Sequence, residues 1–144
     1  MKHSLSLALL YFLLAGCNPS GTHISSSITA AVQAGETSPI DLAAALTSQW
    51  DRFCVLTPYT NNERAAQTLG FKWDAESKTS IASNDGINVL VFIHRNAVVE
   101  FAEHPRNRGD FSQMKPSCLG RKDAKLIRKF GSDGWLYLVT QNDA

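Results

Sequence analysis

The feature that most restricts the fold is a pair of apolar segments joined by only two residues. Residues 87–94 read INVLVFIH, residues 97–104 read AVVEFAEH, and Arg95 and Asn96 lie between them. Two runs rich in β-branched and aromatic residues with a two-residue connection are typical of a β-hairpin. Both faces of the first strand are apolar, which indicates a central strand that is covered on both sides.

A two-residue turn also fixes which side chains share a face, because neighbouring residues of a strand point to opposite sides. Direct pairing across this turn predicts that Leu90 and Phe92 lie beside Val99 and Phe101.

The remaining elements follow from capping signals, apolar spacing and turn residues. The predictions are a helix over 39–51, a strand over 52–57, a short helix that begins in Thr60-Asn61-Asn62-Glu63 and ends at Gly70, a strand near 79–82, and a final hairpin of 125–130 with 135–140. An alternative for 123–130 is a helix, with Leu126, Ile127 and Phe130 facing inward.

Length and composition restrict how these elements combine. A chain of 144 residues with 44% hydrophobic content can form one compact domain, which we place at 39–144. The predicted class is α+β, with a mostly antiparallel sheet of five or six strands and two helices packed against it.

The N-terminus has a different character from the rest of the chain. Lys2 is followed by an apolar run of eleven residues from Leu5 to Ala15. Such a run is too short for a membrane-spanning helix, which needs roughly 20 apolar residues, but it is typical of an export signal.

The end of this run, Leu14-Ala15-Gly16-Cys17, resembles the lipobox of bacterial lipoprotein signal peptides. The resemblance implies that residues 1–16 are a signal peptide that is removed, and that Cys17 carries acyl chains such as palmitate. Two or more chains hold a protein firmly on a membrane. Asn18 is not the aspartate that favours inner-membrane retention, so the implied location is the outer membrane, facing the periplasm. The alternative is an ordinary cleaved signal with an incidental cysteine.

Residues 17–38 are expected to form the lipidated N-terminus and a flexible tether. The segment 18–38 is rich in small and hydroxyl side chains and has one charge, Glu36. A flexible segment of this length has a typical reach of about 25 Å, enough to lift a domain clear of the headgroups.

Cys54 and Cys118 are expected to form a disulfide, because an exported protein reaches an oxidising compartment. The alternatives are two unrelated buried thiols or a nucleophile.

No pattern in the sequence predicts a metal, a cofactor or a catalytic group. The predicted hairpin separates His94 from His104 by about 23 Å, so they cannot share a metal ion, and each is expected at the surface or at an edge. The sequence contains no HExxH or GxSxG motif.

Basic residues are concentrated between His104 and Lys129, where eight Lys or Arg residues accompany two acids. Such a region can attract an acidic protein or an envelope polyanion, whereas nucleic acid is not expected outside the cytoplasm. The alternative is a solvated face with no specific partner. The candidate binding residues are Arg106, Arg108, Arg121, Lys122, Lys125, Arg128 and Lys129.

The segment from Trp50 to Phe111 is similar to small exported bacterial proteins, and this resemblance implies no catalytic residue. It rests on Trp50-Asp51, Pro58-Tyr59-Thr60, Leu69-Gly70-Phe71-Lys72-Trp73, Asp85-Gly86-Ile87-Asn88 and Gly109-Asp110-Phe111.

The function expected from these features is a membrane-anchored, non-enzymatic protein-binding module, for example of an immunity or inhibitor type. A cell-envelope hydrolase whose site is not evident in the sequence, or an accessory subunit of an envelope complex, is the alternative.

Overall fold

The computed structural model describes residues 19–35 and 37–141, and these form an α+β fold with two antiparallel sheets. The four-stranded sheet has the order β4-β3-β2-β5, from β2 (Arg52–Leu56), β3 (Ile87–His94), β4 (Ala97–Pro105) and β5 (Cys118–Gly120). The three-stranded sheet has the order β1-β6-β7, from β1 (Ile40–Asp41), β6 (Lys125–Phe130) and β7 (Leu136–Thr140). The helices are α1 (Pro19–Gln33), α2 (Leu42–Ala45), α3 (Asn62–Leu69) and α4 (Ala75–Lys78), with 3₁₀ turns at Arg106–Arg108 and Arg121–Asp123. The α+β class is confirmed, with the strands divided between two sheets.

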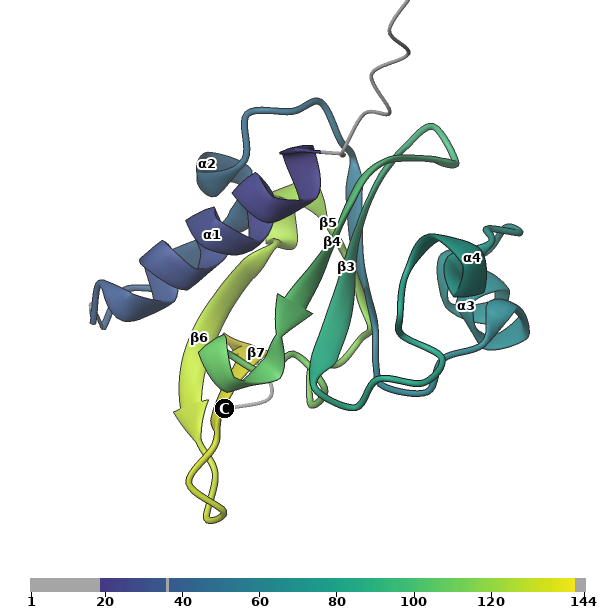
Figure 1. Ribbon diagram of the computed structural model, residues 1–144. Helices are drawn as coiled ribbons and strands as arrows, with labels where there is room; N and C mark the ends of the chain where they lie inside the picture. Colours follow the sequence, from purple (N-terminus) through teal and green to yellow (C-terminus); the bar gives the residue numbers. More distant parts are fainter. Residues whose placement is uncertain (1–18, 36, 142–144) are drawn as a thin grey trace, which may run out of the picture.

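The four-stranded sheet is the middle layer of the molecule (Figure 1). On one side of it lie α3 and α4, and on the other lie α1, α2 and the three-stranded sheet. Alternate residues of β2 and β3 therefore enter two separate cores. Phe53 and Phe92 belong to the core shared with α1, whereas Leu56 and Val91 belong to the core shared with α3. The prediction that 87–94 is a central strand with two buried faces is confirmed.

The β3–β4 hairpin has the predicted two-residue turn, with φ values of 48° at Arg95 and 60° at Asn96. A bulge follows, because Ile93 pairs with Val98 while Phe92 pairs with Glu100. A bulge adds one residue to one strand, so the residues beyond it point to the opposite face of the sheet from the one that direct pairing predicts. The prediction that Phe101 shares a face with Leu90 is therefore wrong, and Phe101 pairs with Val91.

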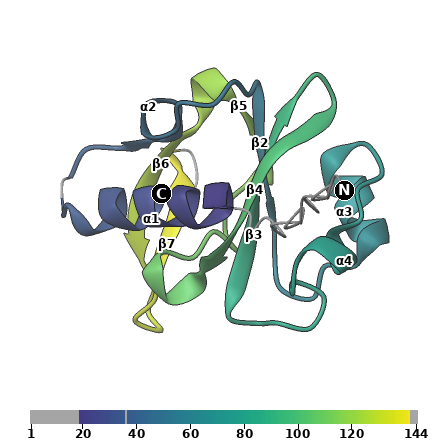
Figure 2. The same ribbon diagram turned by 45° about the horizontal axis from the view of Figure 1, so that its top comes forward.

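The prediction of a flexible tether over 17–38 is wrong for residues 19–33, which form α1. Ile24, Ile28 and Val32 recur at four-residue spacing, and all three are buried in the core that contains Phe53 and Phe92. In Figure 2 this helix lies across the front of the molecule. The folded domain therefore begins by residue 19, not at residue 39.

The predicted helix over 39–51 is mostly absent. Ile40 pairs with Leu126 as part of β1, and Asp41 then caps the single turn of α2 by accepting a hydrogen bond from Ala43 N at 2.9 Å. The guanidinium of Arg121 binds the carbonyl of Ala43 within α2 and those of residues 46, 48 and 50 after it, and the chain after α2 is not helical. Tertiary contacts thus override the local helical pattern.

The final hairpin is confirmed, because β6 pairs with β7 around residues 131–134. The helical alternative for 123–130 is therefore wrong. The strand expected near 79–82 is also absent, since this stretch is a turn that follows α4 and buries Ile81.

A disulfide joins Cys54 to Cys118, as predicted. The two cysteines are direct register partners on β2 and β5, and 64 residues separate them along the chain. The bond therefore ties the short edge strand β5 to the middle of its sheet. Among the residues that the structure describes, no helix has the length and apolar character needed to cross a membrane.

Candidate functional site

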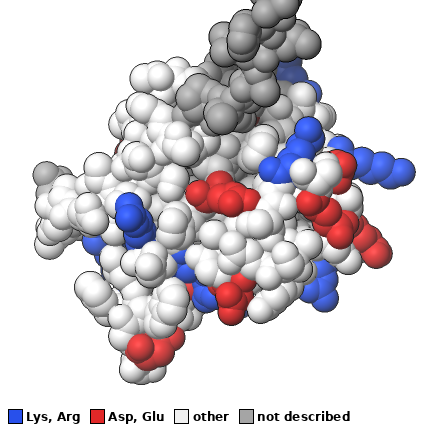
Figure 3. Space-filling model, viewed as in Figure 1, with Lys and Arg blue, Asp and Glu red and all other residues white. Residues whose placement is uncertain are grey.

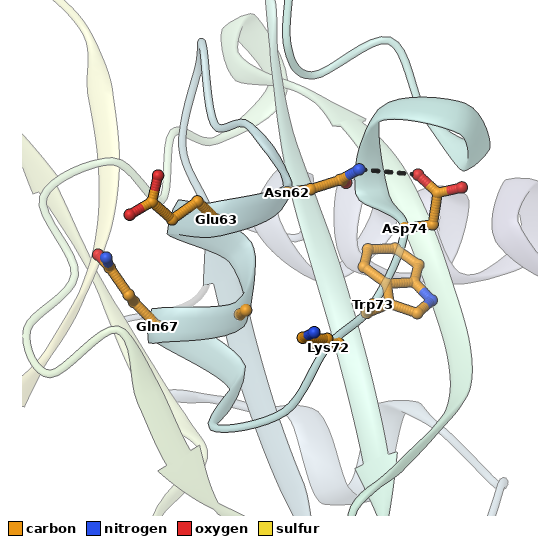
Figure 4. A pocket seen from close by; sticks show the side chains of 7 residues that line it. Asn62, Glu63, Gln67, Lys72, Trp73 and Asp74 are labelled. Atoms are coloured by element: carbon orange, nitrogen blue, oxygen red, sulfur yellow. Dashed lines mark hydrogen bonds between the residues drawn. The ribbon is translucent and has the colours of Figure 1, made fainter.

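The candidate site is an open groove of about 670 Å³ between α3 and the segment that leads into α4 (Figure 4). Its exposed surface is mostly apolar, and its rim carries polar and charged groups. It is lined by Asn62, Glu63, Ala66, Gln67, Lys72, Trp73 and Asp74.

Local signals at both ends of α3 build one wall of the groove. Asn61 caps the helix, its side chain accepting a hydrogen bond from Arg64 N at 2.9 Å. Gly70 ends it with φ 82°, a left-handed conformation that glycine adopts without strain. The chain then turns back, so that Trp73 faces the groove-lining side of α3 that includes Ala66.

Trp73 forms the opposite wall and is held from behind. Its ring meets Phe101 of β4 edge to face, with centroids 5.2 Å apart and an angle of 66° between the planes. The side chain is half-buried, so part of the indole stays open to the groove. A tryptophan fixed in this way offers a large apolar surface that loses little freedom when a partner binds.

A hydrogen-bond network fixes the two walls relative to each other. The Asn62 Nδ2 atom donates to Asp74 Oδ1 at 3.0 Å (Figure 4), and the Asn62 side-chain oxygen accepts from Glu76 N at 3.0 Å. Asp74 also caps α4 through Ser77. These hydrogen bonds, from Ser77 first and then from Asn62, hold the pKa of Asp74 below its usual value. Asp74 is therefore an ionised structural carboxylate, unsuited to the role of a general acid.

The outer rim is free of such internal contacts. Within the described part of the chain, Glu63, Gln67 and Lys72 have no side-chain hydrogen bond or ion pair, and their side chains project from the walls in Figure 4. The groove thus combines a fixed apolar surface with a carboxylate, an amide and an ammonium group that remain available to a partner.

A second polar cluster lies buried beneath α1. His104 is fully buried, so the expectation of a surface or edge histidine is wrong at this position. The bulge in β4 contributes to this result, because it pairs His104 with Asn88 instead of placing it opposite Ile87. The His104 Nδ1 atom lies 3.0 Å from Ser25 Oγ of α1, and the ring meets Phe111 edge to face at 5.5 Å.

Burial lowers the pKa of His104 to about 4. Serine-nucleophile chemistry needs a group that orients the histidine through its second nitrogen. The Nε2 atom of His104 is buried and has no hydrogen-bond partner among the described residues. The pair of Ser25 and His104 therefore lacks the third member of a triad, and we interpret it as a contact that fixes α1 on β4.

Next to this pair, Asp110 is buried and binds three neighbours. It forms an ion pair with Arg106, with 2.7 Å between Arg106 Nη2 and Asp110 Oδ2. It also accepts hydrogen bonds from Asn88 Nδ2 at 3.0 Å and Ser112 N at 2.8 Å. Burial alone would raise the pKa of Asp110, but these hydrogen bonds outweigh it and keep the pKa below its usual value. Asp110 is therefore the ionised centre of a structural network.

Arg106, Arg121 and Arg128, which are candidate binding residues of the basic region, are engaged inside the molecule. Arg106 holds Asp110, and Arg121 binds backbone carbonyls after α2 while stacking over Trp50 at 4.6 Å. Arg128 binds the carbonyls of Ala31 and Val32 at the end of α1. Cations at the C-terminal end of a helix stabilise it.

The surface seen in Figure 3 shows Lys and Arg in separated places among acidic side chains, without a continuous basic patch. The other four candidates are Arg108 in the 3₁₀ turn after β4, Lys122 in the turn after β5, and Lys125 and Lys129 on β6. Partner binding by the set of seven stays a prediction. Cys17, the expected site of acylation, lies outside the described residues.

Sequence reasoning predicted α3 but did not predict that Trp73 and Asp74 lie opposite it. Within the residues that the structure describes, no group of three or more His, Cys, Asp or Glu side chains is placed to hold a metal ion. No protein-family model, curated protein or solved structure is significantly similar to the chain.

Proposed function

We propose that the protein is an exported lipoprotein, anchored through Cys17, that binds a protein partner without catalysing a reaction. The observation that carries the binding proposal is the groove between α3 and Trp73. Its walls are fixed by internal hydrogen bonds, while its apolar surface and three rim groups remain open.

The partner chemistry follows from the walls of this groove. Protein interfaces concentrate their binding free energy on a few anchors, among which tryptophan is over-represented. A partner that places an apolar side chain against Trp73 can also satisfy Glu63 and Lys72 with opposite charges at the rim. The groove lies between a helix and a loop, so a partner would bind through side chains and not by adding a strand.

The binding proposal is tested by photo-crosslinking in cells from position 67 on the rim. The expected result is a discrete adduct that is lost in Ala66→Arg, which places a long side chain in the groove from the α3 wall and keeps both rings of the contact between Trp73 and Phe101. Crosslinking from Ser132 in the β6–β7 turn is the control. A discrete adduct that persists in Ala66→Arg contradicts the groove as the binding site.

The basic region is tested in the same experiment by reversing Arg108, Lys122 and Lys125, whose side chains have no hydrogen bond or ion pair within the described part of the chain. Loss of the adduct in this variant but not in Ala66→Arg would show that the partner binds the basic residues and not the groove.

The lipid anchor has its own test. Mass spectrometry of the mature N-terminus is expected to find a chain that begins at Cys17 with added acyl chains, and Cys17→Ala is expected to leave the membrane fraction. An unmodified chain that begins elsewhere would overturn this part of the proposal.

A further inference from the structure

The position of α1 has a direct consequence for a chain that is anchored at Cys17. Ile24 and Ile28 of this helix are 2% and 0% exposed, so the helix is part of the folded body. Its first turn is also held closely, because a Cβ atom on Gly21 would lie 3.0 Å from the Phe101 carbonyl oxygen of β4. The start of α1 therefore cannot move far from the sheet.

Only one residue, Asn18, separates Cys17 from the start of α1 at Pro19. Consecutive Cα atoms are about 3.8 Å apart, so two peptide units span at most about 7 Å. A flexible tether of 20 residues would instead allow a typical reach of about 25 Å. The length of chain available thus restricts where a lipidated Cys17 can place the domain.

We propose that the end of the molecule at which α1 begins rests against the phospholipid headgroups, an inference that rests on the proposed anchor at Cys17. The protein then has one preferred orientation on the membrane. In Figure 1 the β6–β7 turn lies at the opposite end of the molecule from the start of α1, so this turn points away from the bilayer.

The side chains around the start of α1 suit a polar, zwitterionic headgroup layer. His23 and Ser26 are exposed on the first turns of α1, and Lys78 lies beside Ser26 at a shallow hollow. Hydroxyl and ammonium groups can donate hydrogen bonds to phosphate oxygens. Glu103 at the same hollow and Glu100 beside His23 add negative charge, so we do not expect this end to select anionic lipids.

The orientation also leaves two large exposed apolar side chains, Phe130 and Trp135, away from the lipid. Phe130 is 76% exposed where β6 meets the turn, and Trp135 is 38% exposed where the turn meets β7. Both therefore lie near the end that faces away from the membrane. The groove of α3 lies on the flank of the molecule, where a partner can reach it beside the bilayer.

The test uses the full lipidated protein in phosphatidylcholine vesicles that contain a headgroup-attached quencher. A fluorophore is placed on Ser26→Cys in one sample and on Ser132→Cys in another, after each variant is shown to keep the wild-type unfolding midpoint. We expect quenching at position 26 to be at least about twofold stronger than at position 132. Inserting 20 Gly and Ser residues between Asn18 and Pro19 is expected to remove the difference.

The outcomes separate this inference from the function on which it rests. Protein that floats with the vesicles but is quenched equally at both positions would overturn the orientation and leave the anchor intact. Protein that fails to float because it carries no acyl chains would overturn the anchor, and the orientation with it. Stronger quenching at position 132 would show that the opposite end faces the lipid.

Discussion

At the scale of single residues, the buried His104 links protonation to folding. Burial lowers the pKa of this imidazole to about 4, whereas in an unfolded chain it is about 6.5. Between these two values the unfolded chain binds a proton that the folded protein excludes. The stabilisation from His104 is therefore complete above pH 6.5 and is lost as the pH falls towards 4, by about 3 kcal/mol in total.

The change His104→Gln is expected to remove this part of the pH dependence. Urea unfolding at several pH values between 7 and 4 measures it, with the slope of unfolding free energy against pH as the readout. His23→Gln, at an exposed position of α1, is the matched control and should keep the wild-type slope. Equal slopes in wild type and His104→Gln would contradict the burial of this side chain.

Arg121 provides a second prediction at this scale, because its guanidinium binds backbone carbonyls in α2 and in the chain after it. Removing it leaves part-buried carbonyls without a charged donor, at a cost of about 2 kcal/mol. Arg121→Ala is therefore expected to lower the unfolding free energy by about that amount. The neighbouring Lys122→Ala should change it by less than about 0.5 kcal/mol, since this exposed side chain has no described partner. Equal effects of the two changes would show that Arg121 acts only as a surface charge.

At the scale of elements, local signals predicted the two hairpins and α3 better than the segments that depend on distant contacts. Asn61 and Gly70 are visible as the two ends of α3 because each acts within its own turn. The bulge in β4 has no clear local signature, so the prediction of Phe101 failed beyond it. The apolar residues of α1 are spaced for a helix, but hydroxyl residues between them gave the segment the composition of a tether.

Ile28 tests whether α1 is part of the core. The side chain is fully buried against the core that contains Phe53 and Phe92. Ile28→Ala is expected to lower the unfolding free energy by about 2 to 4 kcal/mol, because it removes buried methyl groups and leaves a cavity. Urea unfolding measures the change, and Ser26→Ala on the exposed face of the same helix is the control. A tether would predict no effect of either substitution.

At the scale of the whole molecule, the groove shows why a site is harder to predict than an element. Its two walls are α3 and the segment after Gly70, and the sequence predicts only the first of them. What brings them together is the pairing of Asn62 with Asp74 and the support of Trp73 by Phe101, 28 residues further along the chain. The bulge in β4 in turn decides which face of the sheet Phe101 lies on. The site therefore could not be predicted from local sequence patterns.

The disulfide connects the early and late parts of the chain, and its removal provides a prediction at this largest scale. Cys54 lies in the middle of the four-stranded sheet, and Cys118 lies on a three-residue edge strand that pairs with β2 alone. Closing a loop of 64 residues stabilises a folded chain by about 4 kcal/mol in the chain-entropy model. The double change Cys54→Ala and Cys118→Ala is therefore expected to lower the unfolding free energy by about that amount.

Denaturant unfolding of the wild type with and without a thiol reductant measures the same loss independently, and the reductant should not affect the double variant. If the reduced wild type kept its full stability, the packing of β5 against β2 would be sufficient without the covalent bond.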